Sequence, residues 1–227
     1  MNSLSRLAAT LSFACIFTSA APADTVLKGN IGARTIDDDV TISADTSCVF
    51  NGTIIKGNVR VLRGARLYSN GAQIDGNVQA DGAFLVDLRK NTRVDGDVQG
   101  KGTRTIRVGG RTAVEGNVQL TEGSAGRRAD ALLVKNASVD GDVQAEKSSG
   151  RIRILGNRVG GNIQVVENST GVYQIRRNRT EGDLQFFKNR GKGKIIANTV
   201  GGNLQSKENS PRPVVKRNTV EGDLEVE

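Results

Sequence analysis

The chain has 227 residues, a formal net charge of +8 at pH 7 and no histidine, which excludes imidazole bases and the usual imidazole metal ligands. Aromatic residues make up only 4% of the chain, which disfavours the stacking platforms of sugar-binding clefts and of single-strand nucleic-acid sites. We therefore expect no specific nucleic-acid partner.

The first 23 residues have the pattern of an export signal. Arg6 supplies a positive end, residues 7–20 an apolar stretch and residues 21–23 a small-residue cleavage site. The apolar stretch is shorter than the about 20 residues that a membrane-spanning helix needs. We predict a signal peptide over residues 1–23, no transmembrane segment after its removal, and a bacterial protein that is secreted, periplasmic or at the cell surface. Only Cys48 remains after cleavage, so no disulfide can form within the mature chain.

The rest of the chain repeats one motif. The tripeptide Gly-Asn/Asp-Val/Leu/Ile, usually followed by Gln, returns with a period near 20 residues. Its glycines are Gly57, Gly76, Gly96, Gly116, Gly141, Gly161, Gly182, Gly202 and Gly222. A short period sustained over most of a chain is typical of one structural unit stacked on copies of itself. We predict a single β-solenoid domain over residues 24–227, with residues 24–35 as an N-terminal cap.

Alignment on this glycine brings apolar residues into columns. They stand two positions before and two positions after it, as Val159 and Ile163 do around Gly161, and a second strand is marked seven positions before it, as by Ile154. A spacing of two indicates a strand with one buried face, so the Asn/Asp and Gln positions in between should face water. Each coil is expected to carry two strands and a short third.

The predicted fold is all-β: a right-handed parallel β-helix of about nine to ten coils. Such coils stack about 4.8 Å apart and hydrogen bond to the coils above and below. The steps between glycines are not multiples of six, which disfavours the left-handed hexapeptide type. Two explanations of the repeated glycine remain open, a small inward-facing residue or a corner with positive φ.

The C-terminal repeats resemble a known group. Residues 198–211, Asn-Thr-Val-Gly-Gly-Asn-Leu-Gln-Ser-Lys-Glu-Asn-Ser-Pro, and residues 217–223, Arg-Asn-Thr-Val-Glu-Gly-Asp, resemble repeats of uncharacterised exported bacterial proteins. The resemblance covers residues 132–227 well and implies a β-solenoid without a known activity. Ser206 replaces a cysteine of that group and the later cysteine is missing, so the disulfide that its pattern suggests cannot form. The repeat is also distantly similar to bactofilins, which polymerise end to end.

Carboxylates flank the repeated glycine and form pairs. Asp95 with Asp97, and Asp140 with Asp142, are candidate Ca²⁺ ligands or acid and base groups for sugar cleavage. Arginines nearby, such as Arg93, favour lateral neutralisation of the charge instead, and the main prediction includes no cofactor.

Two basic segments are candidate binding surfaces. The step of 25 residues between Gly116 and Gly141 predicts a protruding loop over residues 121–130, which carries Arg127 and Arg128. A basic cluster follows later in the chain: Arg176, Arg177, Arg179, Lys188, Arg190, Lys192 and Lys194. Excess positive charge on an exported protein favours anionic envelope polymers as partners.

The sequence thus predicts a non-catalytic, exported structural or adhesive cell-envelope protein. An uncovered terminal coil exposes strand edges, so we expect end-to-end homo-oligomers, and the basic segments suggest binding to an anionic polysaccharide. One alternative is a polysaccharide-active enzyme or a Ca²⁺-dependent carbohydrate-binding module on the acidic face. Another is a functional amyloid subunit built on Asn and Gln ladders.

Overall fold

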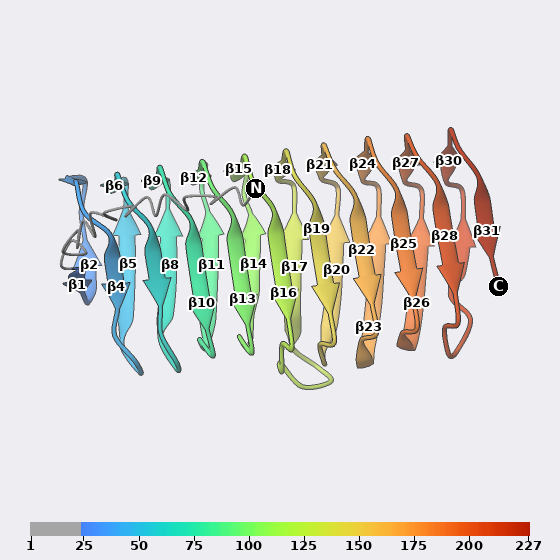
Figure 1. The fold of residues 1–227 in the computed structure, drawn as a ribbon, viewed down its shortest axis with the longest axis horizontal. Coiled ribbons are helices and arrows are strands. Elements are labelled where there is room, and N and C mark those ends of the chain that lie inside the picture. The colour runs from blue at the N-terminus through green and yellow to red at the C-terminus, as the bar shows by residue number, and fades with distance from the viewer. Residues whose placement is uncertain (1–23) are drawn as a thin grey trace, which may run out of the picture.

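The computed structural model describes residues 24–227, and the predicted signal peptide lies outside them. All regular structure in these residues is β-strand, and the strands form three parallel sheets along a rod (Figure 1). One sheet has 11 strands and the other two have 10 each. The predicted all-β solenoid of about ten coils with a period near 20 residues is therefore confirmed.

The chain visits the three sheets in turn, and we name them A, B and C. Sheet A contains β1 (Thr25–Leu27), β4 (Val40–Ile42), β7 (Val59–Val61), β10 (Val78–Asp81), β13 (Val98–Lys101), β16 (Val118–Thr121), β19 (Val143–Glu146), β22 (Ile163–Val166), β25 (Leu184–Phe187), β28 (Leu204–Lys207) and β31 (Leu224–Val226). Sheet B contains β2 (Gly29–Ile31), β5 (Ser47–Asn51), β8 (Arg66–Asn70), β11 (Leu85–Arg89), β14 (Ile106–Gly109), β17 (Asp130–Lys135), β20 (Arg151–Leu155), β23 (Ser169–Arg176), β26 (Arg190–Ile196) and β29 (Val214–Lys216). Sheet C contains β3 (Thr35–Ile36), β6 (Ile54–Ile55), β9 (Gln73–Ile74), β12 (Arg93–Val94), β15 (Ala113–Val114), β18 (Ser138–Val139), β21 (Arg158–Val159), β24 (Arg179–Thr180), β27 (Thr199–Val200) and β30 (Thr219–Val220).

The core consists of aliphatic columns that run along the rod. On sheet A, Val143 pairs with Ile163 and Ile163 with Leu184, and all three are fully buried. On sheet B, Ile154 lies between its register partners Val134 and Ile175 in the same way. Burial of such a side chain contributes roughly 1.5–3 kcal/mol. Because each coil is covered only by its neighbours, the stability is shared along the stack.

Sheet C lies immediately before the repeated glycine. Its strands have two residues each, and Val159 there pairs with Val139 and Thr180. The predicted short third strand is thus found, but the apolar residues before and after the glycine belong to different sheets, which contradicts their expected place on one strand. The chain turns at the glycine, so each coil has three sides. Residues 24–35 supply β1, β2 and the first residue of β3, which are the first layer of the stack.

Both explanations of the repeated glycine are wrong. None of the nine has a positive φ, and they are half-buried or exposed at the corner between sheets C and A rather than facing inward. A Cβ at these positions would instead run into the preceding coil. At Gly161 it would meet a carboxylate oxygen of Asp142 and lie 2.9 Å from the carbonyl carbon of Gly141. The glycine is required because the preceding coil occupies this space.

The space beside each repeated glycine is filled by the Asn or Asp side chain of the preceding coil, as Asp142 fills the space at Gly161. This side chain was expected to face water, but it bonds to the next coil instead. Oδ1 of Asn58 accepts hydrogen bonds from the backbone N–H of Asn77 at 2.9 Å and from its Nδ2 at 3.0 Å. Oδ1 of Asp142 accepts the same two bonds from Asn162, at 2.6 and 3.1 Å. We call this column the corner ladder. Its members are Asp39, Asn58, Asn77, Asp97, Asn117, Asp142, Asn162, Asp183, Asn203 and Asp223.

Buried asparagines form further ladders at the other two corners of the C-terminal coils. Nδ2 of Asn178 donates to the carbonyl of Ile154 at 2.8 Å and to Oδ1 of Asn198 at 3.0 Å, while its own Oδ1 accepts the backbone N–H of Asn157. A second column of this kind runs through Asn168, Asn189 and Asn209. Within residues 24–227 no buried polar side-chain atom lacks a partner.

The corner geometry predicts the effect of a single added methyl group. Gly161→Ala places a Cβ against Asp142 and the Gly141 backbone, so we expect the free energy of unfolding to fall by about 1–3 kcal/mol, as for other overpacked sites. Gly32→Ala is the matched control, because its Cβ would have no atom within 4 Å and its φ is not positive. Denaturant unfolding followed by circular dichroism measures both variants. Equal stability of Gly161→Ala and wild type would contradict the explanation.

Candidate anion-binding surface

The outer face of sheet B is basic because its strands alternate apolar inward residues with outward residues, and Lys and Arg are the commonest charged residues at the outward positions. On β20, Ile152 and Ile154 are buried while Arg151 and Arg153 are half-exposed. We define the basic face as the Lys and Arg side chains of the sheet B strands: Arg66, Arg89, Arg107, Lys135, Arg151, Arg153, Arg176, Arg190, Lys192, Lys194 and Lys216. The same strands carry only two acidic residues, Asp87 and Asp130.

These two carboxylates are covered by the arginines around them. Oδ1 of Asp87 accepts a hydrogen bond from Nε of Arg89 at 2.8 Å, and Arg107 lies 3.8 Å from the other oxygen. Asp130 is held in the same way by Nε of Arg153 at 2.8 Å. Both aspartate side chains are less than a tenth exposed, so they anchor arginines without presenting negative charge to solvent.

Sheet A differs from sheet B in its outward residues. Its central column is a ladder of glutamine amides, in which Nε2 of Gln119 donates to Gln144 at 3.0 Å and Nε2 of Gln164 donates to Gln185 at 2.9 Å. Charged residues on the sheet A strands are balanced between acid and base: Arg60, Lys101 and Lys207 against Asp81, Glu146 and Glu225. Of these two sheets, sheet B therefore carries the excess of positive charge.

The fold divides the predicted basic cluster among several faces. Arg176, Arg190, Lys192 and Lys194 belong to the basic face, whereas Arg179 lies on β24 of sheet C. Arg177 and Lys188 occupy corners where the backbone adopts positive φ, at 56° and 53°. Sequence reasoning missed the other members of the basic face. The available signal was their position directly beside the inward-facing column, as for Arg153 beside Ile154.

The predicted protruding loop lies between β16, which ends at Thr121, and β17, which begins at Asp130. The two arginines of the loop point to different places. Arg127 lines a surface hollow together with Arg190 and Lys192, whereas the side chain of Arg128 is exposed and does not line it. The structure thus brings together two basic segments that are far apart in the sequence.

Three of the four carboxylates in the predicted pairs have protein partners. Oδ1 of Asp97 accepts the backbone N–H of Asn117 at 2.7 Å, and its Oδ2 accepts Nε2 of Gln99 at 3.1 Å. Asp142 is bonded in the same way within the corner ladder. Asp95 accepts Nε of Arg93 at 2.7 Å, and Asp140 is exposed. In residues 24–227 no three carboxylate or thiol side chains gather as a metal cluster, and the calcium hypothesis remains a prediction.

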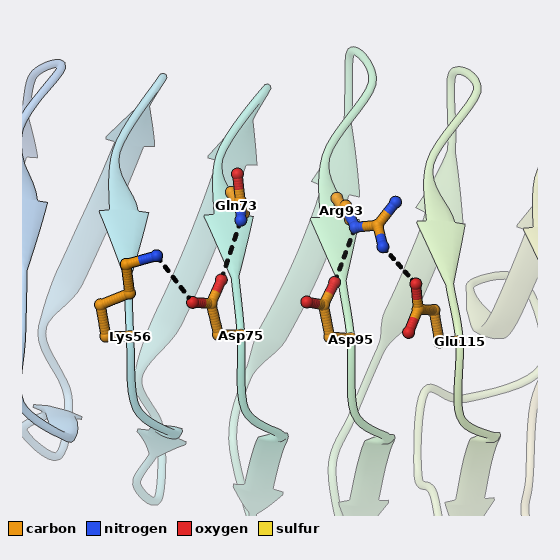
Figure 2. A network of polar contacts seen from close by, with 6 residues as sticks. All are labelled: Lys56, Gln73, Asp75, Arg93, Asp95 and Glu115. Atoms are coloured by element: carbon orange, nitrogen blue, oxygen red, sulfur yellow. Dashed lines mark hydrogen bonds and ion pairs between the residues drawn. The ribbon is translucent and has the colours of Figure 1, made fainter.

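Lateral ion pairs neutralise charge on the outer side of sheet C, as Figure 2 shows for four successive coils. Nζ of Lys56 lies 2.9 Å from Oδ2 of Asp75, and Oδ1 of Asp75 accepts a hydrogen bond from Gln73 at 3.0 Å. Arg93 bridges Asp95 and Glu115. Hydrogen bonds from Lys56 and then Gln73 lower the pKa of Asp75, and the same contact with Asp75 raises the pKa of Lys56.

The last coil exposes apolar side chains that are buried in the coils before it. Leu224 is 59% exposed, whereas its register partner Leu204 is fully buried. On β29, Val215 is only partly buried, whereas its register partner Ile195 is fully buried. Among the residues that the structure describes, nothing packs on the far side of this coil. The predicted end-to-end association would cover these side chains, and it remains a prediction.

Comparison of the chain with protein-family models, with curated proteins and with solved structures found no match. The predicted resemblance to exported solenoids and to bactofilins therefore remains a prediction. Within the described part of the chain, no helix has the length and apolarity that crossing a bilayer requires.

The sheet C network predicts a shifted titration. Because the folded state lowers the pKa of Asp75, this carboxylate contributes stability above the ordinary aspartate pKa of about 3.9, and the contribution is lost as the pH falls through the lowered value. We expect Lys56→Gln to raise the pKa of Asp75, because the hydrogen bond from Lys56, which lowers this pKa most, is removed. Carbon-13 NMR titration of the Asp75 carboxyl measures this. Lys188→Gln on another corner is the control, and an unchanged Asp75 pKa in Lys56→Gln would contradict the assignment.

Proposed function

We propose that this protein is a non-catalytic, exported structural or adhesive component of the bacterial cell envelope that binds acidic polysaccharide along its basic face. The observation that carries the proposal is the recurrence of Lys and Arg along the outer face of sheet B, where a cation returns about every second coil, as Lys135, Arg176 and Lys216 do in one register column. Export itself is inferred from the residue pattern of positions 1–23.

The geometry of the stack favours a long, regularly charged ligand. Neighbouring strands of a sheet lie about 4.8 Å apart, so outward cations recur along the rod at multiples of that spacing. Gln174 on β23 pairs with Lys194 on β26, and Arg153 precedes them on β20. A single exposed ion pair contributes only about 0–1 kcal/mol. Useful affinity therefore requires many contacts made at once, which a polymer supplies.

Polysaccharide is favoured over nucleic acid by the lack of stacking platforms on this face. Among the sheet B strands the aromatic residues are Phe50, Tyr68 and Tyr173, and Phe50 and Tyr173 are fully buried in the core. Non-specific binding of single-stranded nucleic acid combines a positive groove with base stacking. The strands of the basic face supply charge and only Tyr68 as an outward aromatic residue, and the ring of the adjacent Phe84 is already covered by the guanidinium groups of Arg66 and Arg104.

The proposal predicts binding that depends on which face is altered. We expect the double variant Arg176→Glu with Lys194→Glu to lower the affinity for labelled polygalacturonate or heparin at least about tenfold, which is a modest loss of roughly 1.4 kcal/mol. Arg60→Glu with Lys101→Glu on sheet A changes the net charge equally and is the matched control. Fluorescence anisotropy across a salt series measures both, with neutral dextran as the ligand control.

Affinity should fall steeply with salt for wild type, because the attraction is electrostatic and screened. Equal losses in the two double variants would mean that net charge alone attracts the polymer. Absence of binding to any acidic polymer at low salt would contradict the proposed function itself.

A further inference from the structure

We infer that the hollow formed by Arg127, Arg190 and Lys192 is a specific site for one oxyanion, a carboxylate or sulfate, of the acidic polysaccharide. This inference rests on the proposed function and names the place on the rod where one anionic group of the polysaccharide binds. The hollow lies where the loop after β16 meets the beginnings of β23 and β26.

The loop is fixed in place by backbone hydrogen bonds to the next coil. The N–H of Ser149 donates to the carbonyl of Gly123 at 2.7 Å, and the N–H of Arg151 donates to the carbonyl of Ala129 at 2.8 Å. The loop also closes over Gly150, where an added Cβ would lie 3.0 Å from the Cβ of Ala125. These contacts hold the segment between Gly123 and Ala129 against the stack, so the position of Arg127 is set by the fold.

The uncharged residues that line the hollow include two glycines, Gly171 and Gly191, beside Thr170, Val172 and Pro211. Gly171 and Gly191 pair across β23 and β26, and a bulge at Thr170 shifts the register just before them. Thr170 has a φ of 53° and is exposed at this point. A Cβ on Gly171 or Gly191 would meet the backbone of the preceding coil, so neither position tolerates a side chain. The two glycines are therefore required by the close packing of successive coils at this point.

The charge in the hollow lacks a counterion within the protein. Arg127, Arg190 and Lys192 line it, no acidic residue does, and none of the three takes part in an ion pair in residues 24–227. Cations held close together repel one another unless an anion lies between them. Guanidinium groups bind carboxylate and sulfate through paired N–H donors, and the hydroxyl of Thr170 adds a further donor.

The experiment compares the two neighbouring arginines of the loop in the full chain. Arg127→Gln removes a cation that lines the hollow, whereas Arg128→Gln makes the same charge change one residue away, at a side chain outside it. The probes are galacturonate hexamers, whose only anionic groups are carboxylates, and carrageenan hexasaccharides, whose only anionic groups are sulfates. We expect Arg127→Gln to weaken binding of the preferred oligomer at least about tenfold and Arg128→Gln by less than about twofold. Backbone NMR shifts on binding should centre on Thr170, Gly171 and Gly191.

The outcomes separate this site from the proposed function. Equal weakening by Arg127→Gln and Arg128→Gln, or binding of long polymers without binding of hexamers, would overturn the site and leave the basic face as a diffuse binding surface. If the wild-type protein binds neither the hexamers nor the long acidic polymers, both this site and the proposed function are wrong. Both variants should keep the wild-type thermal midpoint, because both side chains are exposed, and the NMR spectrum reports directly whether either is misfolded.

Discussion

The structure depends on the corner ladder, where each Asn or Asp oxygen accepts the backbone N–H of the next coil. This bond is made in the space that a side chain at the repeated glycine would occupy, so glycine and Asn/Asp form one device. The device fixes the distance and register between coils at the bend from sheet C to sheet A. With the register fixed, the aliphatic columns of all three sheets come into line, as Val143, Ile163 and Leu184 do. Charge alternation along the ladder also keeps carboxylates from lying directly on one another.

The same register determines what the rod presents to solvent. A residue beside an inward-facing position must face outward, and the residue one coil later takes the same place on the next strand. Sheet A in this way gains a neutral glutamine ladder, sheet C gains lateral ion pairs such as Lys56 with Asp75, and sheet B gains an excess of cations over carboxylates. A rod with three chemically different sides can bind a polymer on one side while the other sides remain available for other contacts. The proposed function follows from this division.

The sequence predicted the fold class, the coil period and the main core columns, because each depends on a repeated spacing that can be read directly from the sequence. It did not predict the corner. Val159 and Ile163, two positions before and after Gly161, would both face inward on a single straight strand. They also both face inward on two strands joined by a bend, so the spacing alone cannot distinguish a straight strand from a corner. The candidate surface was also predicted only in part. A run such as Arg176 to Lys194 wraps around all three sides of a coil, whereas a real surface joins residues about one coil apart. The approach of Arg127 to Arg190 depends on a loop that occurs once, so no repeat reveals it.

The most direct test of the account is the rise per coil along sheet A. Spin labels on a Cys48→Ser background, placed at Gln99 with Gln185, at Gln99 with Gln205, and at Gln79 with Gln205, span four, five and six register steps of the same column. Double electron–electron resonance should give narrow distance distributions. Their mean distance should increase by about 4.8 Å per register step and be about 24 Å for the pair five steps apart. Broad distributions, or distances that do not increase linearly with the number of coils, would contradict an in-register stack held by the corner ladder.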